Sequence, residues 1–111
     1  MSDRVVVIIG TGERDKALAG AMYAVNARKY GWLADVQLVF FGPSEALLLA
    51  DEDLQEMVLE YGRQEGTALA CRFVADRSGV REGLTELGVE VIYVGERISN
   101  LIRDGYVPMV W

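Results

Sequence analysis

The sequence predicts an α/β protein, a three-layer α/β/α sandwich around a mainly parallel, five-stranded sheet. Short apolar runs rich in β-branched residues alternate with longer segments of helical periodicity along the whole chain, and this alternation is typical of parallel sheets. The first run, Arg4 to Gly10, has apolar residues on both faces, as a central strand needs. The 111 residues predict a single domain, residues 1–111.

The first half of the chain predicts two strands around one long helix. After the strand at Arg4 to Gly10, a helix is expected over Glu13 to Tyr30, with Gly31 as a left-handed cap, and a second strand over Asp35 to Gly42. The helix carries one stripe of larger side chains (Leu18, Ala21, Met22 and Val25) and one of small residues (Ala17, Gly20, Ala24 and Ala27). The small stripe allows another element to pack closely against it.

The middle of the chain predicts a short helix after Pro43 and Ser44, then a longer helix over Asp53 to Glu65. Asp53 and Glu56 have the spacing of a capping box at the start of the longer helix. Because Gly66 breaks this pattern, a third strand is expected over Thr67 to Val74.

The last third predicts two further helices and two strands. Ser78 is expected to cap a helix that runs to Leu87 and ends at Gly88. A strand over Val89 to Gly95, a helix over Glu96 to Asp104 and a strand over Tyr106 to Trp111 complete the pattern. Pro108 has no N–H to donate, which favours an edge position for the last strand.

Composition and charge narrow the classes of partner. The net charge of −6 argues against nucleic acid and against anionic membrane surfaces, since both require basic faces. No apolar run approaches the roughly 20 residues of a membrane span. The first apolar run is short and lacks a cleavage-like ending, so we interpret it as a strand and expect a cytoplasmic protein.

The absence of histidine and the presence of one cysteine restrict the chemistry. Without histidine there is no Ser-His or Cys-His nucleophile pair and no histidine metal site. A single cysteine builds neither an intrachain disulfide nor a zinc or iron–sulfur site within one chain. We therefore expect no cofactor and no metal, and any covalent chemistry has to use a thiol that lacks an imidazole partner.

Cys71 is the candidate for such chemistry. It lies towards the carboxyl end of a predicted parallel strand, where open α/β sheets place their binding crevices. Arg72 and Arg77 flank it, and a helix N-terminus is expected near Ser78. Nearby cations and a helix N-terminus both favour a thiolate over a thiol. The alternative is an inert core cysteine, which is common for a lone cysteine in a strand.

The end of the chain resembles the DsrE/DsrF-like family. The likeness rests on the segment from Ala70 to Leu84 followed by Gly88 to Trp111, and it extends to the helix start at Gly10 to Ala24 and the passage from Val36 to Leu49. Cys71, Arg77 and Gly79 stand where that family has a cysteine, an arginine and a glycine.

The resemblance implies a single DsrE-like domain that forms dimers, trimers or hexamers and carries a persulfide on Cys71. The protein is then a sulfur carrier, a possible sulfurtransferase, that exchanges sulfur with donor and acceptor proteins. Arg77, Arg72, Ser78 and Gly79 are the expected supports for the anionic sulfur.

Two other hypotheses remain open. The first is a homo-oligomeric binding or scaffold protein of the same fold in which the cysteine is incidental. The second is a nucleotide-binding module that uses the turn Gly10-Thr11-Gly12 between a strand and a helix. This turn is neither a dinucleotide fingerprint nor a P-loop, and Glu13 and Asp15 repel phosphate.

Overall fold

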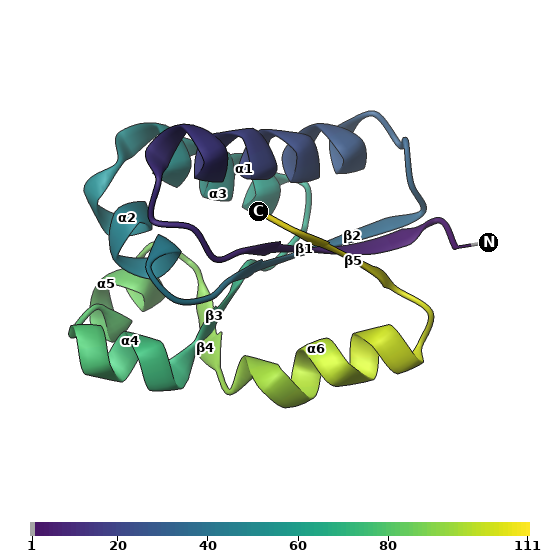
Figure 1. The fold of residues 1–111 in the computed structure, drawn as a ribbon. Coiled ribbons are helices and arrows are strands. Elements are labelled where there is room, and N and C mark those ends of the chain that lie inside the picture. The colour runs from purple at the N-terminus through teal and green to yellow at the C-terminus, as the bar shows by residue number, and fades with distance from the viewer. Residues whose placement is uncertain (1) are drawn as a thin grey trace.

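Five parallel strands form one sheet with helices on both faces, as the computed structural model of residues 2–111 shows (Figure 1). The order across the sheet is β4-β3-β2-β1-β5. The predicted three-layer sandwich is therefore confirmed. The strands are β1 (Arg4–Ile9), β2 (Asp35–Phe40), β3 (Leu69–Cys71), β4 (Glu90–Ile92) and β5 (Val107–Val110).

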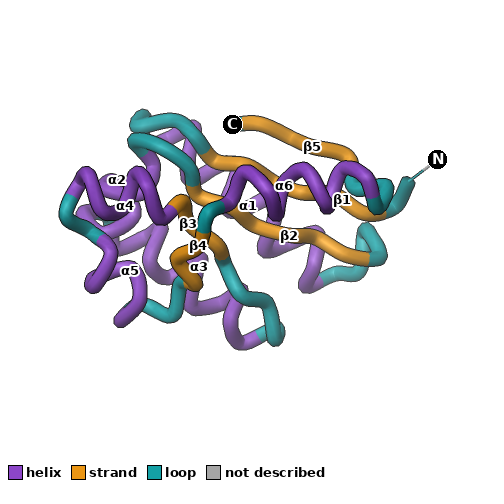
Figure 2. The backbone as a smooth tube through the Cα atoms, turned by 90° about the horizontal axis from the view of Figure 1, so that it is seen from below, coloured by secondary structure: helices purple, strands orange, loops and turns teal. Residues whose placement is uncertain are grey.

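Six helices connect these strands. They are α1 (Arg14–Lys29), α2 (Ser44–Ala50), α3 (Glu52–Arg63), α4 (Arg72–Ser78), α5 (Arg81–Glu86) and α6 (Val94–Arg103). Helices α1 and α3 cover one face of the sheet and α6 runs along the other, while α2, α4 and α5 gather at one end (Figure 1). Figure 2 shows β1, β2 and β5 side by side, with the short strands β3 and β4 beyond β2. Within residues 2–111, none of the helices combines the length and the apolar character that a bilayer crossing requires.

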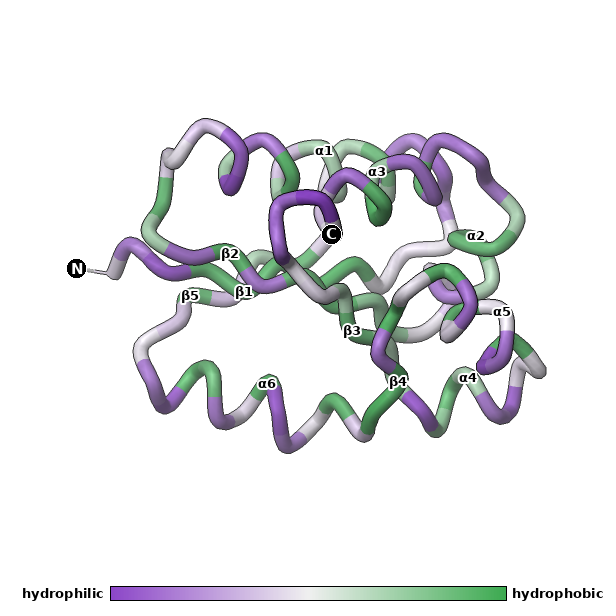
Figure 3. The backbone as a smooth tube through the Cα atoms, turned by 180° about the vertical axis from the view of Figure 1, so that it is seen from behind, coloured by the Kyte–Doolittle hydropathy of each residue, from purple (hydrophilic) through white to green (hydrophobic). Residues whose placement is uncertain are grey.

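The alternation of side chains along the strands divides the core into two parts. Val5, Val7 and Ile9 of β1 point into the cluster beneath α1 and α3, whereas Val6 points into a second cluster beneath α6. Figure 3 shows hydrophobic residues concentrated along the middle of the sheet, between helices in which hydrophobic and hydrophilic residues alternate. Cys71 belongs to the second cluster, on the α6 face.

The small stripe of α1 is the face that packs. Ala17, Gly20, Ala24 and Ala27 are buried, and Ala21 and Val25 complete that face. The larger stripe is only partly buried, because Met22 is 46% exposed. Small side chains allow the helix to approach its neighbours closely, and from the predicted stripe of larger residues only Ala21 and Val25 join them in the buried face.

The last strand lies at an edge of the sheet, as Pro108 predicted. β5 pairs with β1 alone. The N–H of Trp111 donates to the carbonyl of Ile8, and alternate residues of a strand direct their N–H groups to opposite sides. The nitrogen of Pro108 therefore faces away from β1, where no strand requires its N–H.

Several sequence-based boundaries are wrong. β4 ends at Ile92, and Val94 and Gly95 belong to α6 instead of the strand. β3 ends at Cys71, and Arg72 to Ser78 form α4 instead of continuing the strand. Ser78 is the last residue of α4 and caps no helix, because Gly79 at φ +69° ends α4 and α5 begins after Val80. A short apolar run fits a strand and a helix equally well, and only the pairing with neighbouring strands decides between them.

The cap of α3 is also displaced from its predicted place. Asp51 and not Asp53 is the N-cap, and its carboxylate accepts the N–H of Leu54 at 3.0 Å. The helix starts two residues early because Asp51 adopts extended backbone angles (φ −122°, ψ 115°), which place its side chain over the free N–H groups.

Candidate functional site

The candidate site lies at the carboxyl edge of the sheet, where β1, β2 and β3 end next to one another. Phe41, directly after β2, donates its N–H to the carbonyl of Ile9 at 3.0 Å, so the two chain segments stay together beyond the last strand residues. Gly10 donates to the carbonyl of Trp111 at 2.9 Å, which joins β5 to the same edge. In open parallel sheets this edge is where binding crevices form.

Cys71 is the last residue of β3 and stands at this edge. Only 7% of its surface is exposed, and its side chain packs in a cluster with Val6, Val39, Leu69 and Val94. Although Cys71 occupies the N-cap position of α4, its side chain makes no capping hydrogen bond. The thiol is therefore free and largely covered by hydrocarbon.

The two arginines expected to support the thiol have other partners. Nε of Arg72 lies 3.6 Å from a carboxylate oxygen of Asp76, and its guanidinium lies 5.4 Å from the ring centre of Tyr93. The guanidinium of Arg77 lies 5.6 Å from the ring centre of Phe73. The charge of Arg72 is thus partly neutralised by Asp76, and Arg77 lies on the outer surface of α4.

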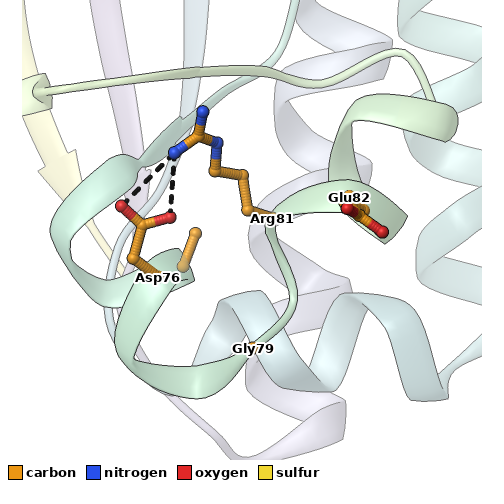
Figure 4. A pocket seen from close by; sticks show the side chains of 5 residues that line it. Asp76, Gly79, Arg81 and Glu82 are labelled. Atoms are coloured by element: carbon orange, nitrogen blue, oxygen red, sulfur yellow. Dashed lines mark hydrogen bonds and ion pairs between the residues drawn. The ribbon is translucent and has the colours of Figure 1, made fainter.

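Ser78 and Gly79 are not brought to Cys71. They lie at the far end of the seven-residue helix α4, about 10 Å along its axis at 1.5 Å per residue. Gly79 instead lines a shallow hollow of about 400 Å³ between α4 and α5, together with Ala75, Asp76, Arg81 and Glu82 (Figure 4). Arg81 donates to Asp76 at 3.2 Å across this hollow.

Glu45 is the residue that the sequence-based reasoning missed. It lies in the first turn of α2 and is fully buried, with 0% of its surface exposed. Its Oε2 accepts the N–H of Gly42 at 3.3 Å, while its Oε1 is buried and makes no hydrogen bond among the described residues. Burial raises the pKa of Glu45 to about 7, although the backbone N–H groups of Gly42 and Cys71 lower it.

The signal for Glu45 was present in the sequence. An acid stands directly between the end of a buried strand and the apolar run Ala46 to Ala50. At the start of a helix an acid is ordinarily explained by the helix dipole and by solvent. Only the folded chain shows that α2 turns this side chain inward, towards the ends of β2 and β3.

A buried carboxyl group and a nearly buried thiol thus share one edge of the sheet. The backbone N–H of Cys71, at the end of β3, is one of the influences that lower the pKa of the Glu45 carboxyl group. A carboxyl group that titrates near pH 7 is common at sites that handle protons or nucleophiles. The chain has no histidine, and the pKa of Glu45 lies in the range where histidine usually titrates.

This edge also carries exposed apolar side chains. Four exposed residues follow the ends of successive strands, namely Phe41 after β2, Phe73 in α4, Tyr93 after β4 and Val110 at the end of β5. Exposed aromatic side chains of this kind are enriched where proteins meet partners.

The comparisons with known proteins establish the fold and no function. No protein-family profile and no curated protein matches this chain. Among solved structures, the chain is similar to a conserved protein of unknown function, BT1422 from Bacteroides thetaiotaomicron, with a TM-score of 0.89 and 26% identity. The match covers 98% of this chain and 95% of that protein. The whole of the described fold therefore has a close counterpart.

Proposed function

We propose that this protein is a sulfur carrier that holds a transferable sulfur atom on Cys71. The observation that carries the proposal is the position of Cys71: the only cysteine ends a parallel strand at the carboxyl edge of the sheet, beside a buried acid. This edge is where proteins of this architecture bind their ligands. The resemblance of the sequence to DsrE/DsrF-like proteins points to the same residue.

The chemistry requires one thiolate and no histidine. The Cys71 thiolate attacks the outer sulfur of a donor persulfide, R–S–SH. The S–S bond of the donor breaks, R–S⁻ leaves with the electron pair, and Cys71–S–SH forms. An acceptor thiolate then attacks the outer sulfur, and Cys71–S⁻ is released. Each step exchanges one S–S bond for another and needs no oxidant or reductant.

Intact-mass measurement after exposure to glutathione persulfide tests the proposal. We expect the wild-type protein to gain the mass of one sulfur atom and to lose it again on addition of an acceptor thiol. Cys71→Ser is the matched control and gains nothing. If the folded wild-type protein gains no sulfur while the unfolded chain does, the carrier function is rejected.

The burial of Cys71 favours a second candidate, a binding or scaffold protein with an incidental cysteine. Only 7% of the residue is exposed, and a buried cysteine behaves as a small hydrophobic side chain. Alkylation kinetics separate the two candidates. A carrier reacts with iodoacetamide in the folded state, whereas an incidental cysteine reacts only as fast as the chain unfolds.

Both candidates include self-association, and the exposed rim of Phe41, Phe73, Tyr93 and Val110 supports it. A homo-oligomer covers such side chains. Sedimentation velocity at micromolar concentration tests this part, with Phe73→Ser and Tyr93→Ser expected to shift the protein towards a smaller species. If the wild-type protein is monomeric, the proposed self-association is rejected and the proposed sulfur chemistry is unaffected.

A further inference from the structure

We propose that the outer face of α1 is an interface between two copies of this chain, which pack antiparallel across a two-fold axis at Met22. The inference rests on the self-association included in the proposed function, and it names the surface and the partner. It does not depend on the sulfur chemistry, because α1 and α6 cover opposite faces of the sheet and Cys71 packs on the α6 face (Figure 1).

Helix α1 carries no charge over its middle turns. Residues 17–27 are all uncharged, on the outer side of the helix as well as on the side that packs against the sheet. The outer side of α3, in contrast, exposes Glu56 and Arg63, and that of α6 exposes Glu96 and Arg97. A helix that is apolar on every side is typical of one that is covered on every side. The sequence of α1 therefore fits a helix whose outer side is covered by a partner.

The outer side of α1 exposes apolar and aromatic side chains. Met22 is 46% exposed, and Ala19, one turn before it, is exposed as well. Just beyond the helix, the ring of Trp32 stacks on that of Tyr30 with the ring centres 5.7 Å apart, and it lies 6.3 Å from the ring of Tyr23. The three rings continue the apolar surface of the helix. Methionine and aromatic side chains are enriched where proteins contact one another.

Two opposite charges stand at equal distances from Met22 along this surface. Asp15 lies seven residues before Met22 and Lys29 lies seven residues after it. Residues seven apart share one side of an α-helix, because 3.6 residues make a turn. An antiparallel two-fold axis at Met22 therefore places each Asp15 beside the partner's Lys29, as a symmetric interface requires. This charge complementarity is the reason for assigning the surface to a second copy of the chain.

Both charges are free to meet a partner. The side chain of Asp15 is 88% exposed, and it lies 3.4 Å from Arg14, a group that also pairs with acids at the start of α3. Lys29 is exposed, with its ammonium group 5.4 Å from the ring centre of Tyr30. Exposed charges at the two ends of an apolar surface contribute little affinity, but they fix the register in which two copies pack.

Cross-linking at the proposed axis tests the geometry. Met22→Cys is made in a Cys71→Ser background, so that the new thiol is the only one, and the protein is treated with bismaleimidoethane at micromolar concentration. Glu86→Cys, on the exposed surface of α5, is the control in the same background. We expect Met22→Cys to be converted mostly to a covalent dimer and Glu86→Cys to remain mostly uncoupled. Equal yields in the two proteins overturn the inference.

Charge reversal tests the register, with sedimentation velocity as the measurement. In Asp15→Lys both pairs across the axis become two lysines, and in Lys29→Asp both become two aspartates. We expect each variant to dimerise about tenfold more weakly than the wild type. The double variant Asp15→Lys/Lys29→Asp again has two opposite pairs and should dimerise like the wild type. Loss of favourable helix-dipole interactions cannot explain that recovery, because the double variant reverses the charge at both ends of α1.

The outcomes separate this interface from the rest of the proposed function. If the double variant dimerises no better than the single variants, the antiparallel register is wrong and the inference is overturned. If the charge variants keep the size of the wild type while Phe73→Ser and Tyr93→Ser reduce it, self-association uses the carboxyl edge of the sheet and not α1. Uptake of sulfur from glutathione persulfide is measured separately, and Asp15→Lys should retain it even as a monomer.

Discussion

Gly20 of α1 lies directly against the indole ring of Trp111. A Cβ atom at position 20 would stand 2.6 Å from Cγ of that ring, closer than side chains approach one another. The carbonyl of Trp111 also accepts the N–H groups of Gly10 and Thr11, at 2.9 and 3.2 Å. Through these contacts the end of β5 is held between the first helix and the end of the first strand.

Gly20→Ala is therefore expected to destabilise the protein by about 1–3 kcal/mol, because the new methyl group has to displace the indole ring. Urea unfolding measures this cost. Gly62→Ala in α3 is the matched control, since nothing lies within 4 Å of its Cβ position, and it should stabilise the protein by about 0.5–1 kcal/mol through helix propensity. In a Trp111→Ala background the cost of Gly20→Ala should vanish. If Gly20→Ala has the same urea stability as the wild type, the close contact between Gly20 and Trp111 is contradicted.

Asp51 is expected to matter more to α3 than Asp53. It accepts the N–H of Leu54 and forms an ion pair with Arg14, and these interactions outweigh burial and lower the pKa of its carboxyl. Asp51→Ala should lower the urea midpoint well beyond experimental error, and Asp51→Asn, which keeps a capping oxygen, should lower it less. Asp53→Ala is the control and should have a small effect. If Asp53→Ala lowered the urea midpoint more than Asp51→Ala does, Asp53 would be the N-cap, as the sequence predicted.

The raised pKa of Glu45 makes stability depend on pH near neutrality. Its pKa is about 7 in the folded protein against an ordinary value of 4.5, so the folded state binds more protons between these values. Stability therefore falls as the pH rises from about 5 to 8, by up to about 3 kcal/mol. Urea unfolding at several pH values should show this slope in the wild type and a nearly flat profile in Glu45→Gln. Equal slopes in the two proteins would show that Glu45 does not titrate in this range.

At the amino-terminal edge of the sheet, Tyr106 and Asp35 form a hydrogen bond. The hydroxyl of Tyr106 donates to Asp35 at 2.5 Å. Burial raises the pKa of Asp35, but Tyr106, Gln37 and Arg28 together hold it below its usual value. Stability from Asp35 is thus present above about pH 4 and is lost on acidification.

Tyr106→Phe should remove about 1 kcal/mol at pH 7 and move acid unfolding to higher pH, as followed by circular dichroism. Tyr93→Phe is the control, because its side chain is exposed. An acid transition that is identical in Tyr106→Phe and the wild type would show that the hydroxyl does not stabilise the Asp35 carboxylate.

The sequence was most informative where local patterns are strong. The five strands and the long helices were predicted because their apolar residues repeat at a clear period, and Pro108 correctly indicated an edge strand. The region from Thr67 to Leu87 was misread. Its apolar residues, such as Phe73 and Val74, suit a strand or a helix, and Ser78 resembled a cap although Gly79 ends the preceding helix.

The predictions for the candidate site were likewise right in part. Cys71 was predicted to lie towards the carboxyl end of its strand and is the last residue of β3, although the pattern had extended that strand to Val74. Its burial depends on how the surrounding elements pack, α6 among them. The pairing of Arg72 with Asp76 and the distance of Ser78 from Cys71 follow from residues 72–78 forming a helix, which the apolar pattern did not distinguish from a strand.

By itself, then, the sequence determined the layers of this protein and the presence of one thiol without histidine, since periodicity and composition are local properties that need no partner. Only the tertiary structure decided which groups surround that thiol. The orientation of α2 turns Glu45 inward, towards the backbone N–H groups of Gly42 and Cys71. This orientation depends on packing against α3, α4 and α5, and the last two are distant in the chain. A carboxyl group's burial, and with it its charge, is a property of that packing.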